Sequence, residues 1–199
     1  TWDYQCNGMA LQVTGGLAEV CVIEGNVGSG ANQTDGDLSN LSISGGEVRN
    51  CVIRNNGVRG GCAGVYMTGG TLHDSLICGN VASNCFAQTS GGAGVRMTAK
   101  SALMYNCIVS RNCTLFDAER KGYSGIQMSN GTVSNCVVYG NYGGDIYKTG
   151  GTVKFTCSGN TVEGEGNVCA DAQLRSPETG DFSLLATAPV SISDSTDPA

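Results

Sequence analysis

Apolar and polar residues alternate in short runs along most of this chain. The clearest runs are "GVYM" at 64–67, "GVRM" at 94–97 and "GIQM" at 125–128, where every second residue is apolar. This period of two is typical of a strand that buries one face. No stretch keeps the i, i+3, i+4 spacing of an amphipathic helix, and glycine recurs too often for helix interiors. The pattern therefore predicts an all-β fold made of many short strands.

The strands belong to a unit that recurs along the chain. "GGEVRNCVIRNN" at 45–56 returns as "GGLAEVCVIEGN" at 15–26, "GGTLHDSLICGN" at 69–80 and "NGTVSNCVVYGN" at 130–141. A shorter sixth copy, "GGTVKFTCSGN", occupies 150–160. When the copies are aligned on the asparagine that closes each one, two columns emerge. The closing column holds Asn26, Asn56, Asn80, Asn112 and Asn141, and the column five residues earlier holds Cys21, Cys51, Ser75, Cys107 and Cys136.

Each copy contains a bend between its two apolar runs. Val48 and Ile53 are five residues apart, an odd spacing that one straight strand cannot place on a single face. A bend near Asn50 and Cys51 removes the conflict, because asparagine tolerates the left-handed backbone of a tight corner. Each unit is therefore predicted to read as strand, glycine turn, strand, bend, strand and asparagine turn, followed by a loop.

Columns of identical residue types indicate how the units pack on one another. Stacked parallel coils place each residue about 4.8 Å from its equivalent in the next coil, whereas a β-sandwich gives no such columns. The copies differ in length mainly after the closing asparagine, and insertions on one side are what a solenoid permits. We predict a solenoid of about six coils in which both columns are structural ladders.

The motif "GGxVxNCxIxxN" and the glycine-rich return "GGAGV" resemble the right-handed parallel β-helix repeats of bacterial surface and secreted proteins. The resemblance covers residues 8 to about 160. The end of the chain is similar to the closing segments of such domains, through Gly180, Asp181, Phe182 and Leu184, with Ala188-Pro189 where Ser-Pro would be expected. The resemblance implies a parallel β-helix domain over 1–188 with an irregular cap from about 161, and a polar linker or tail over 189–199. It implies no particular activity, because this fold hosts lyases, hydrolases, adhesins and inert stalks.

Charge and hydropathy exclude two classes of partner. The formal net charge of −6 and the isoelectric point near 4.6 argue against nucleic acid, which requires a basic face. No apolar run approaches the ~20 residues of a membrane-spanning helix. The opening "TWDYQCNGMA" lacks the features of a signal peptide, so we interpret it as the boundary of a mature domain. From the resemblance we expect an extracellular or cell-surface location.

The eleven cysteines include no CxxC pair, so we predict no zinc site and no cofactor. The column cysteines are predicted to be small buried apolar groups. They are not expected to pair, because stacked side chains run parallel to one another, a poor geometry for a disulfide. Cys85 and Cys113 follow neighbouring asparagine turns and are candidates for a bridge between loops.

Candidate catalytic groups are few. The single histidine, His73, shares a column with Glu19, Arg49, Tyr105 and Ser134 that we expect to face solvent. Asp35 and Asp37 in "TDGDLS" are close enough for a glycosidase pair or a calcium loop, but a Gly-Asp loop is usually a turn. We predict no catalytic residue and no metal ligand.

Two groups of residues are candidates for ligand binding. The outward position of the first strand in successive units carries Gln12, Ser42, Tyr66, Arg96, Gln127 and Tyr147. Such a column of rings, guanidinium and amides could bind a sugar, or reflect only the residue preferences of a solvated sheet. The loop at 113–123 is the most charged of the variable loops, and we expect that 114–121 can be trimmed without loss of folding. Its candidate ligand-binding residues are Phe116, Asp117, Glu119, Arg120 and Tyr123.

These observations favour a non-enzymatic structural or adhesion module of a larger bacterial surface protein, with a glycan or a host or cell-surface protein as partner. A second hypothesis is a carbohydrate-active enzyme, either a polysaccharide lyase or a glycoside hydrolase, or a glycan-binding domain on the same fold. A third is a filament-forming subunit that associates end to end, because the ends of a solenoid are sheet edges that pair readily.

Overall fold

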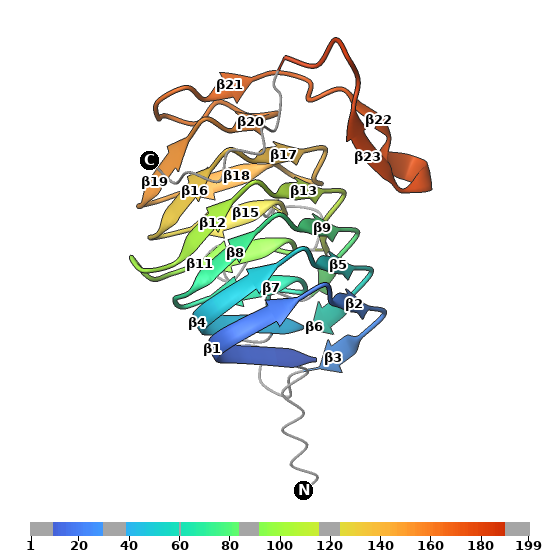
Figure 1. The fold of residues 1–199 in the computed structure, drawn as a ribbon. Helices are drawn as coiled ribbons and strands as arrows, with labels where there is room; N and C mark the ends of the chain where they lie inside the picture. The colour runs from blue at the N-terminus through green and yellow to red at the C-terminus, as the bar shows by residue number, and fades with distance from the viewer. Residues whose placement is uncertain (1–9, 30–38, 60, 84–91, 116–123, 190–199) are drawn as a thin grey trace, which may run out of the picture.

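The computed structural model describes residues 10–29, 39–59, 61–83, 92–115 and 124–189. The regular structure of these residues is nearly all strand, apart from one 3-10 turn at Pro177–Thr179, and every pairing among the coils is parallel. Figure 1 shows the strands stacked in layers from β1 at one end to β19, β20 and β21 at the other. The structure confirms the predicted all-β parallel solenoid. No helix in the described part of the chain is long and apolar enough to cross a membrane.

The first sheet has ten strands, and the other two long sheets are narrower. Its strands are β1 (Leu11–Glu19), β4 (Leu41–Arg49), β7 (Val65–Met67), β8 (Thr71–His73), β11 (Val95–Met97), β12 (Leu103–Tyr105), β15 (Ile126–Met128), β16 (Thr132–Ser134), β18 (Ile146–Lys148) and β19 (Thr152–Lys154). In the first two coils this sheet is formed by one nine-residue strand each, β1 and β4. In the later coils the glycine turn divides it into two three-residue strands. This sheet carries both candidate polar columns.

The second and third sheets complete the wall of the solenoid. The second sheet contains β2 (Val22–Glu24), β5 (Val52–Arg54), β9 (Leu76–Cys78), β13 (Ile108–Ser110), β17 (Val137–Tyr139), β20 (Cys157–Ser158) and β21 (Val168–Cys169). The third contains β3 (Val27–Ser29), β6 (Gly57–Arg59), β10 (Val81–Ser83) and β14 (Cys113–Leu115). Long connections run from the ends of β3, β10 and β14 to the next strand of the first sheet, so all three begin at the third sheet.

Left-handed residues make the predicted bends. Asn50 has φ of 52°, and the equivalent Asp74, Asn106 and Asn135 have φ of 49°, 52° and 50°. Glycine is required at the other turn of the first sheet. A Cβ on Gly46, at φ of 75°, would lie 2.5 Å from the carbonyl oxygen of Gly16 in the coil below. The close approach of one coil to the next therefore fixes glycine in this column.

The core is a stack of aliphatic side chains and methionines inside the three sheets. Leu41, Ile43, Val48 and Ile53 of one coil are all fully buried. Each contributes roughly 1.5–3 kcal/mol through the apolar surface it removes from water. Met67, Met97, Met104 and Met128 line the same interior at 0–1% exposure.

The asparagine column is a hydrogen-bonded ladder, as predicted. The side-chain oxygen of Asn80 accepts bonds from the backbone N–H and the Nδ2 of Asn56, at 3.1 and 2.9 Å. Its Nδ2 donates to the carbonyl of Ile53 and to Oδ1 of Asn112, both at 3.0 Å. The ladder ends at Asp145, whose Oδ1 accepts from the N–H and Nδ2 of Asn141 at 2.9 and 2.8 Å. A carboxylate cannot donate, so it stops the relay of side-chain bonds.

The cysteine column is also a ladder of hydrogen bonds, which the interpretation as apolar groups missed. The Cys51 thiol donates to the carbonyl of Arg49 at 3.0 Å, and its sulfur accepts the N–H of Cys21 at 3.4 Å. All column cysteines are free thiols, buried in every case except Cys21, which is half-buried. In the shortened sixth copy Thr156 takes the position, and Cys157 stands one place later, opposite Val137.

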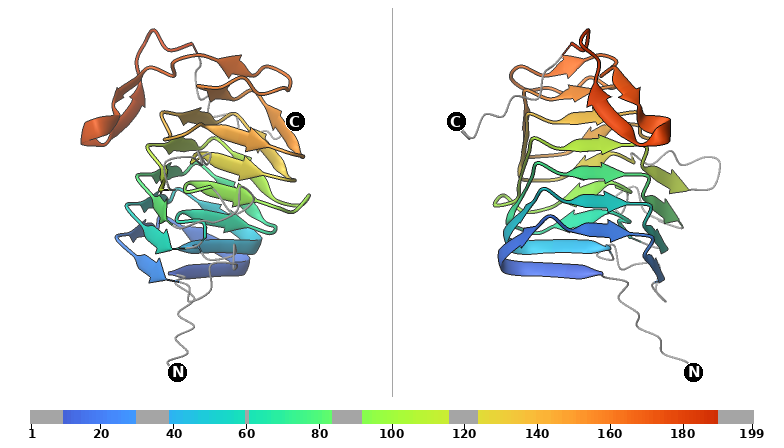
Figure 2. Two further views of the ribbon diagram at one scale, coloured as in Figure 1. Left: turned by 180° about the vertical axis from the view of Figure 1, so that it is seen from behind. Right: turned by 45° about the vertical axis from the view of Figure 1, so that its right-hand side comes forward.

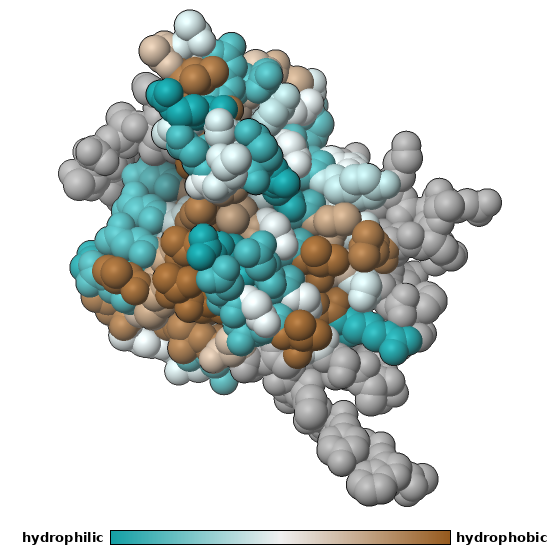
Figure 3. Space-filling view, turned by 90° about the vertical axis from the view of Figure 1, so that its right-hand side faces the viewer, coloured by the Kyte–Doolittle hydropathy of each residue, from teal (hydrophilic) through white to brown (hydrophobic). Residues whose placement is uncertain are grey.

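The segment after β20 closes the far end of the solenoid. Val162 packs against the end of the core, and Asn167 binds the N–H of Thr156 and the carbonyl of Val153. The hairpin of β22 (Leu174–Ser176) and β23 (Asp181–Leu184) projects to the side of the stack (Figure 2). Leu174 and Leu184 pack against the outside of the second sheet. Below the hairpin, that side of the molecule still presents hydrophobic surface (Figure 3).

Candidate functional site

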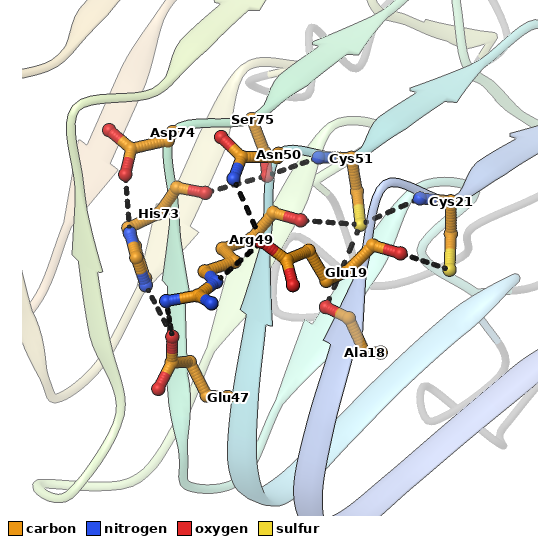
Figure 4. Close-up of polar contacts among 10 residues, drawn as sticks. All are labelled: Ala18, Glu19, Cys21, Glu47, Arg49, Asn50, Cys51, His73, Asp74 and Ser75. Carbon is orange, nitrogen blue, oxygen red and sulfur yellow. Dashed lines mark hydrogen bonds and ion pairs between the residues drawn. The ribbon is translucent and has the colours of Figure 1, made fainter.

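A group of ionisable side chains gathers on the outer surface of the first sheet, where β1, β4, β8 and β12 end. Parallel pairing places Glu19, Arg49, His73 and Tyr105 in one column. Glu47 joins from two residues earlier on β4, and Asp74 from the bend after β8. Figure 4 shows the carboxylates and the arginine converging on this patch of the sheet. We call these six residues the His73 cluster.

His73 lies at the centre of the cluster with both ring nitrogens engaged. Its Nδ1 lies 2.6 Å from Oδ2 of Asp74, and its Nε2 lies 3.1 Å from Oε1 of Glu47. The ring stacks on that of Tyr105, with centroids 4.5 Å apart and an interplanar angle of 12°. Only 7% of His73 is exposed. The prediction that His73 faces solvent is therefore wrong, because its neighbours in the adjacent coils cover the ring.

Arg49 links the carboxylates of two coils. Its Nε binds Oε1 of Glu19 at 3.1 Å, and its Nη1 lies 3.3 Å from Oε1 of Glu47. The hydrogen bond from Arg49 lowers the pKa of the Glu19 carboxyl, and the same bond raises the pKa of Arg49. Both side chains are more than a third exposed, so water screens this pair and it adds little stability.

Burial raises the pKa of the Tyr105 phenol, and the negative charges of Asp74 and Glu47 raise it further. The phenol therefore stays protonated at neutral pH. A general base needs a nitrogen or oxygen within reach of a substrate proton. Because carboxylates of the protein itself occupy both nitrogens of His73, the cluster is suited to joining adjacent coils rather than to proton transfer.

The polar column on the other half of the first sheet is assembled as the spacing predicts. Tyr66, Arg96, Gln127 and Tyr147 are successive Cα partners across β7, β11, β15 and β18, with Ser42 and Gln12 on the coils below. The Arg96 guanidinium carbon lies 5.3 Å from the centroid of the Tyr66 ring. Gln127 is buried, whereas Tyr66, Arg96 and Tyr147 are half-exposed. Tyr66 and Arg96 therefore reach the surface one coil apart, about 4.8 Å, and the buried Gln127 separates them from Tyr147.

Other predicted features fall partly or wholly outside the described residues. These are the loop candidates Phe116, Asp117, Glu119, Arg120 and Tyr123, the pair Asp35 and Asp37, and Cys85. Cys113 is described and carries a free thiol. Among the residues that the structure places, no group of three or more histidine, cysteine or acidic side chains could hold a metal ion.

Sequence reasoning placed His73 in one column with Tyr105, on which it stacks, but missed its hydrogen-bonding partners Glu47 and Asp74. Glu47 lies in a different column, and its side chain reaches His73 only across the coil-to-coil step. Asp74 occupies the bend position that asparagine fills in other coils, so the pattern indicates a turn residue rather than a partner of His73. The available signal was local: the one histidine of the chain is followed directly by an aspartate, in a sequence poor in charge.

Comparisons with family models, with curated proteins and with solved structures give no match to this chain. Its class is therefore defined by the fold itself, a parallel β-solenoid with internal asparagine and thiol ladders.

Proposed function

We propose that this chain is a non-enzymatic structural or adhesion module of a larger bacterial surface protein. The observation that carries the proposal is the unbroken asparagine ladder from Asn26 to Asp145, which ties each coil to the next through buried side chains. Satisfied buried polar networks rigidify a core and specify one arrangement. A rigid scaffold of this kind suits a stalk or a platform for binding loops.

The state of the thiols is compatible with an extracellular setting. Burial raises the pKa of the Cys51, Cys78, Cys107 and Cys157 thiols. Because the thiolate is the form that is oxidised, a raised pKa and burial protect these cysteines. The chain can therefore keep free thiols in an oxidising compartment.

The placement of the insertions supports a binding role. The three long connections begin after β3, β10 and β14, which belong to one sheet, and binding groups concentrate on such loops. A glycan or a cell-surface protein is the proposed partner. The internal pairing of the His73 cluster favours binding over hydrolysis or elimination.

A second candidate is glycan binding on the strand face, favoured by the contact between Arg96 and Tyr66. Aromatic rings bind the apolar faces of sugars, and arginine and amide groups bind hydroxyls. Tyr147, also half-exposed, would extend this stripe along the solenoid.

Binding to a panel of bacterial and host polysaccharides tests both candidates. Two variants locate the site: replacement of residues 116–122 by a short Gly-Asn turn, and Tyr66→Ser on the strand face. If the loops bind, the first variant loses affinity and the second retains it, and the reverse result favours the strand face. Release of new reducing ends or of unsaturated products from any polysaccharide would overturn the non-enzymatic proposal.

A further inference from the structure

The first coil, β1 to β3, leaves core positions open that the second coil, β4 to β6, buries. Leu11, Ala18 and Cys21 are only partly buried, although they pack against the main core. Their partners one coil on, Leu41, Val48 and Cys51, are 0%, 0% and 2% exposed. The columns are otherwise equivalent, and the described residues supply no neighbouring coil on the outer side of coil one.

Both ladders also stop at the first coil with acceptors pointing outward. In every later step, the N–H and Nδ2 of one asparagine donate to the Oδ1 of the next. Among the described residues, no donor reaches Oδ1 of Asn26. Likewise, Cys51 sulfur accepts the N–H of Cys21, whereas no described N–H reaches the sulfur of Cys21. The open groups are those that a further parallel coil would satisfy.

The rim of the first coil is unusually apolar. Leu17, Val20, Val22 and Val27 are 53%, 74%, 64% and 86% exposed. Val20 has φ of 55°, in the bend position that Asn50, Asp74, Asn106 and Asn135 fill in later coils. A β-branched residue in this region is strained, and packing within the described chain does not explain it.

The opposite end of the solenoid is closed. Asp145 ends the asparagine ladder, and its N–H binds Oδ1 of Asn160 at 3.1 Å. The core position at this end, Val153, is 1% exposed, with Val162 packed against the core and Asn167 bound to the Val153 carbonyl. The two ends therefore differ in chemistry: the C-terminal end is capped, whereas the N-terminal end presents hydrogen-bond acceptors and apolar side chains.

We propose that the N-terminal end of the solenoid is a docking surface for a further parallel coil of the same repeat, belonging to the larger protein. Its closing asparagine would donate through the N–H and Nδ2 to Asn26, and the backbone N–H at its cysteine position would donate to Cys21. A second copy in head-to-head orientation would set Asn26 acceptors against each other, and the closed end of a second copy offers no open donor ladder. This inference rests on the proposed role as a module of a longer protein.

The test adds such a coil to the full chain. A copy of residues 41–64 is inserted between Ala10 and Leu11, since that length carries Leu41 to its partner Val65 one coil on. Alkylation of Cys21 by iodoacetamide is followed by peptide mass mapping. The reaction should slow about tenfold or more, towards the rate at Cys51, because the added coil makes local unfolding around Cys21 rarer. The control is the same insert with valine at the position copied from Asn56, which should protect Cys21 less.

Several results would overturn the docking proposal. These are an unchanged Cys21 rate in a folded insert variant, a Cys21 as slow as Cys51 in the unaltered chain, or protection that rises with protein concentration alongside a dimer mass. If the insert does not fold, a synthetic 41–64 peptide added to the unaltered chain should slow the same reaction, and no slowing at millimolar peptide refutes the idea. Failure of polysaccharide binding leaves this readout untouched, so the two proposals fail separately.

Discussion

The hydroxyl of Ser75 accepts the backbone N–H of Cys51 at 3.1 Å and donates to the carbonyl of His73 at 2.7 Å. Cys51 makes the same two kinds of bond one coil earlier, to the N–H of Cys21 and the carbonyl of Arg49. Serine and cysteine are thus interchangeable in this column because both are small and can donate and accept. The column is selected for hydrogen bonding at the bend as well as for volume.

We therefore expect Cys51→Ser to be nearly neutral and Cys51→Val to destabilise the fold. Valine is somewhat larger than cysteine and leaves the N–H of Cys21 without a partner, which costs roughly 1–3 kcal/mol. The carbonyl of Arg49 loses the thiol but still accepts the N–H of Val20 at 3.2 Å. Urea denaturation of the two variants measures the difference. Ser75→Cys is the reverse control and should also be close to neutral. Equal stability of the serine and valine variants would show that the column is purely apolar.

Substitution of an asparagine in the middle of the ladder should lower stability more than substitution at its open end. Asn80 is fully buried and makes four side-chain hydrogen bonds, so Asn80→Ala should lower the free energy of unfolding by roughly 3 kcal/mol or more. Asn26→Ala at the open end is the matched control, because Asn26 is half-buried and lacks a donor from a preceding coil in the described structure. Thermal denaturation should rank Asn80→Ala well below Asn26→Ala, and a reversed ranking contradicts the ladder as a stabilising element.

Buried thiols should make the protein sensitive to alkali. Burial holds the pKa of the Cys107 thiol well above 9.0, its ordinary value, and the Cys51, Cys78, Cys113 and Cys157 thiols shift in the same direction. Well below pH 9 both states keep these protons, so the thiols do not make stability depend on pH there. As pH rises further, the unfolded chain loses protons that the folded chain retains, and stability falls.

Denaturant midpoints measured under reducing conditions from neutral pH to about pH 10.5 will check this dependence. Cys107→Ser should show a shallower fall, because it removes the most strongly shifted thiol. A flat profile in the unaltered protein would show that the thiols are accessible to solvent. Replacement of Cys107 by aspartate should prevent folding at neutral pH, since a buried charge there has no partner.

Substitutions at His73 separate its two contacts. His73→Phe retains a ring that can stack on Tyr105 but removes the imidazole contacts with Asp74 and Glu47, of which Glu47 keeps Arg49 as a partner. His73→Ala loses the stacking as well as these contacts. We expect both variants to be less stable than the parent, with alanine the worse, by thermal denaturation. Binding to any polysaccharide partner should be unaffected in the folded fraction. Loss of binding with full stability would instead make the cluster part of a ligand site.

The columns explain why so much of this fold could be predicted from sequence. In stacked parallel coils each position repeats the same environment, so Asn26 to Asn141 and Cys21 to Cys136 carry the register directly. Even the bend at Asn50 was visible from the spacing of Val48 and Ile53. Contacts between side chains of different columns could not be predicted. The burial of His73 requires side chains from three coils, and the periodicity of the sequence does not specify their rotamers.

The sequence also could not locate where the third sheet ends and a loop begins, and this defines a last prediction. Thr114 was expected to belong to a dispensable loop over 114–121, but it is 2% exposed within β14, and its N–H binds the hydroxyl of Ser124 at 2.8 Å. Replacement of 116–122 by a Gly-Asn turn should therefore be nearly neutral, because loop length itself contributes little. Replacement of 114–121 removes Thr114 and its bonds to Ser124, so it should lower the unfolding midpoint clearly. Equal midpoints for the two deletions, measured by circular dichroism, would show that β14 is not needed for the stability of this corner.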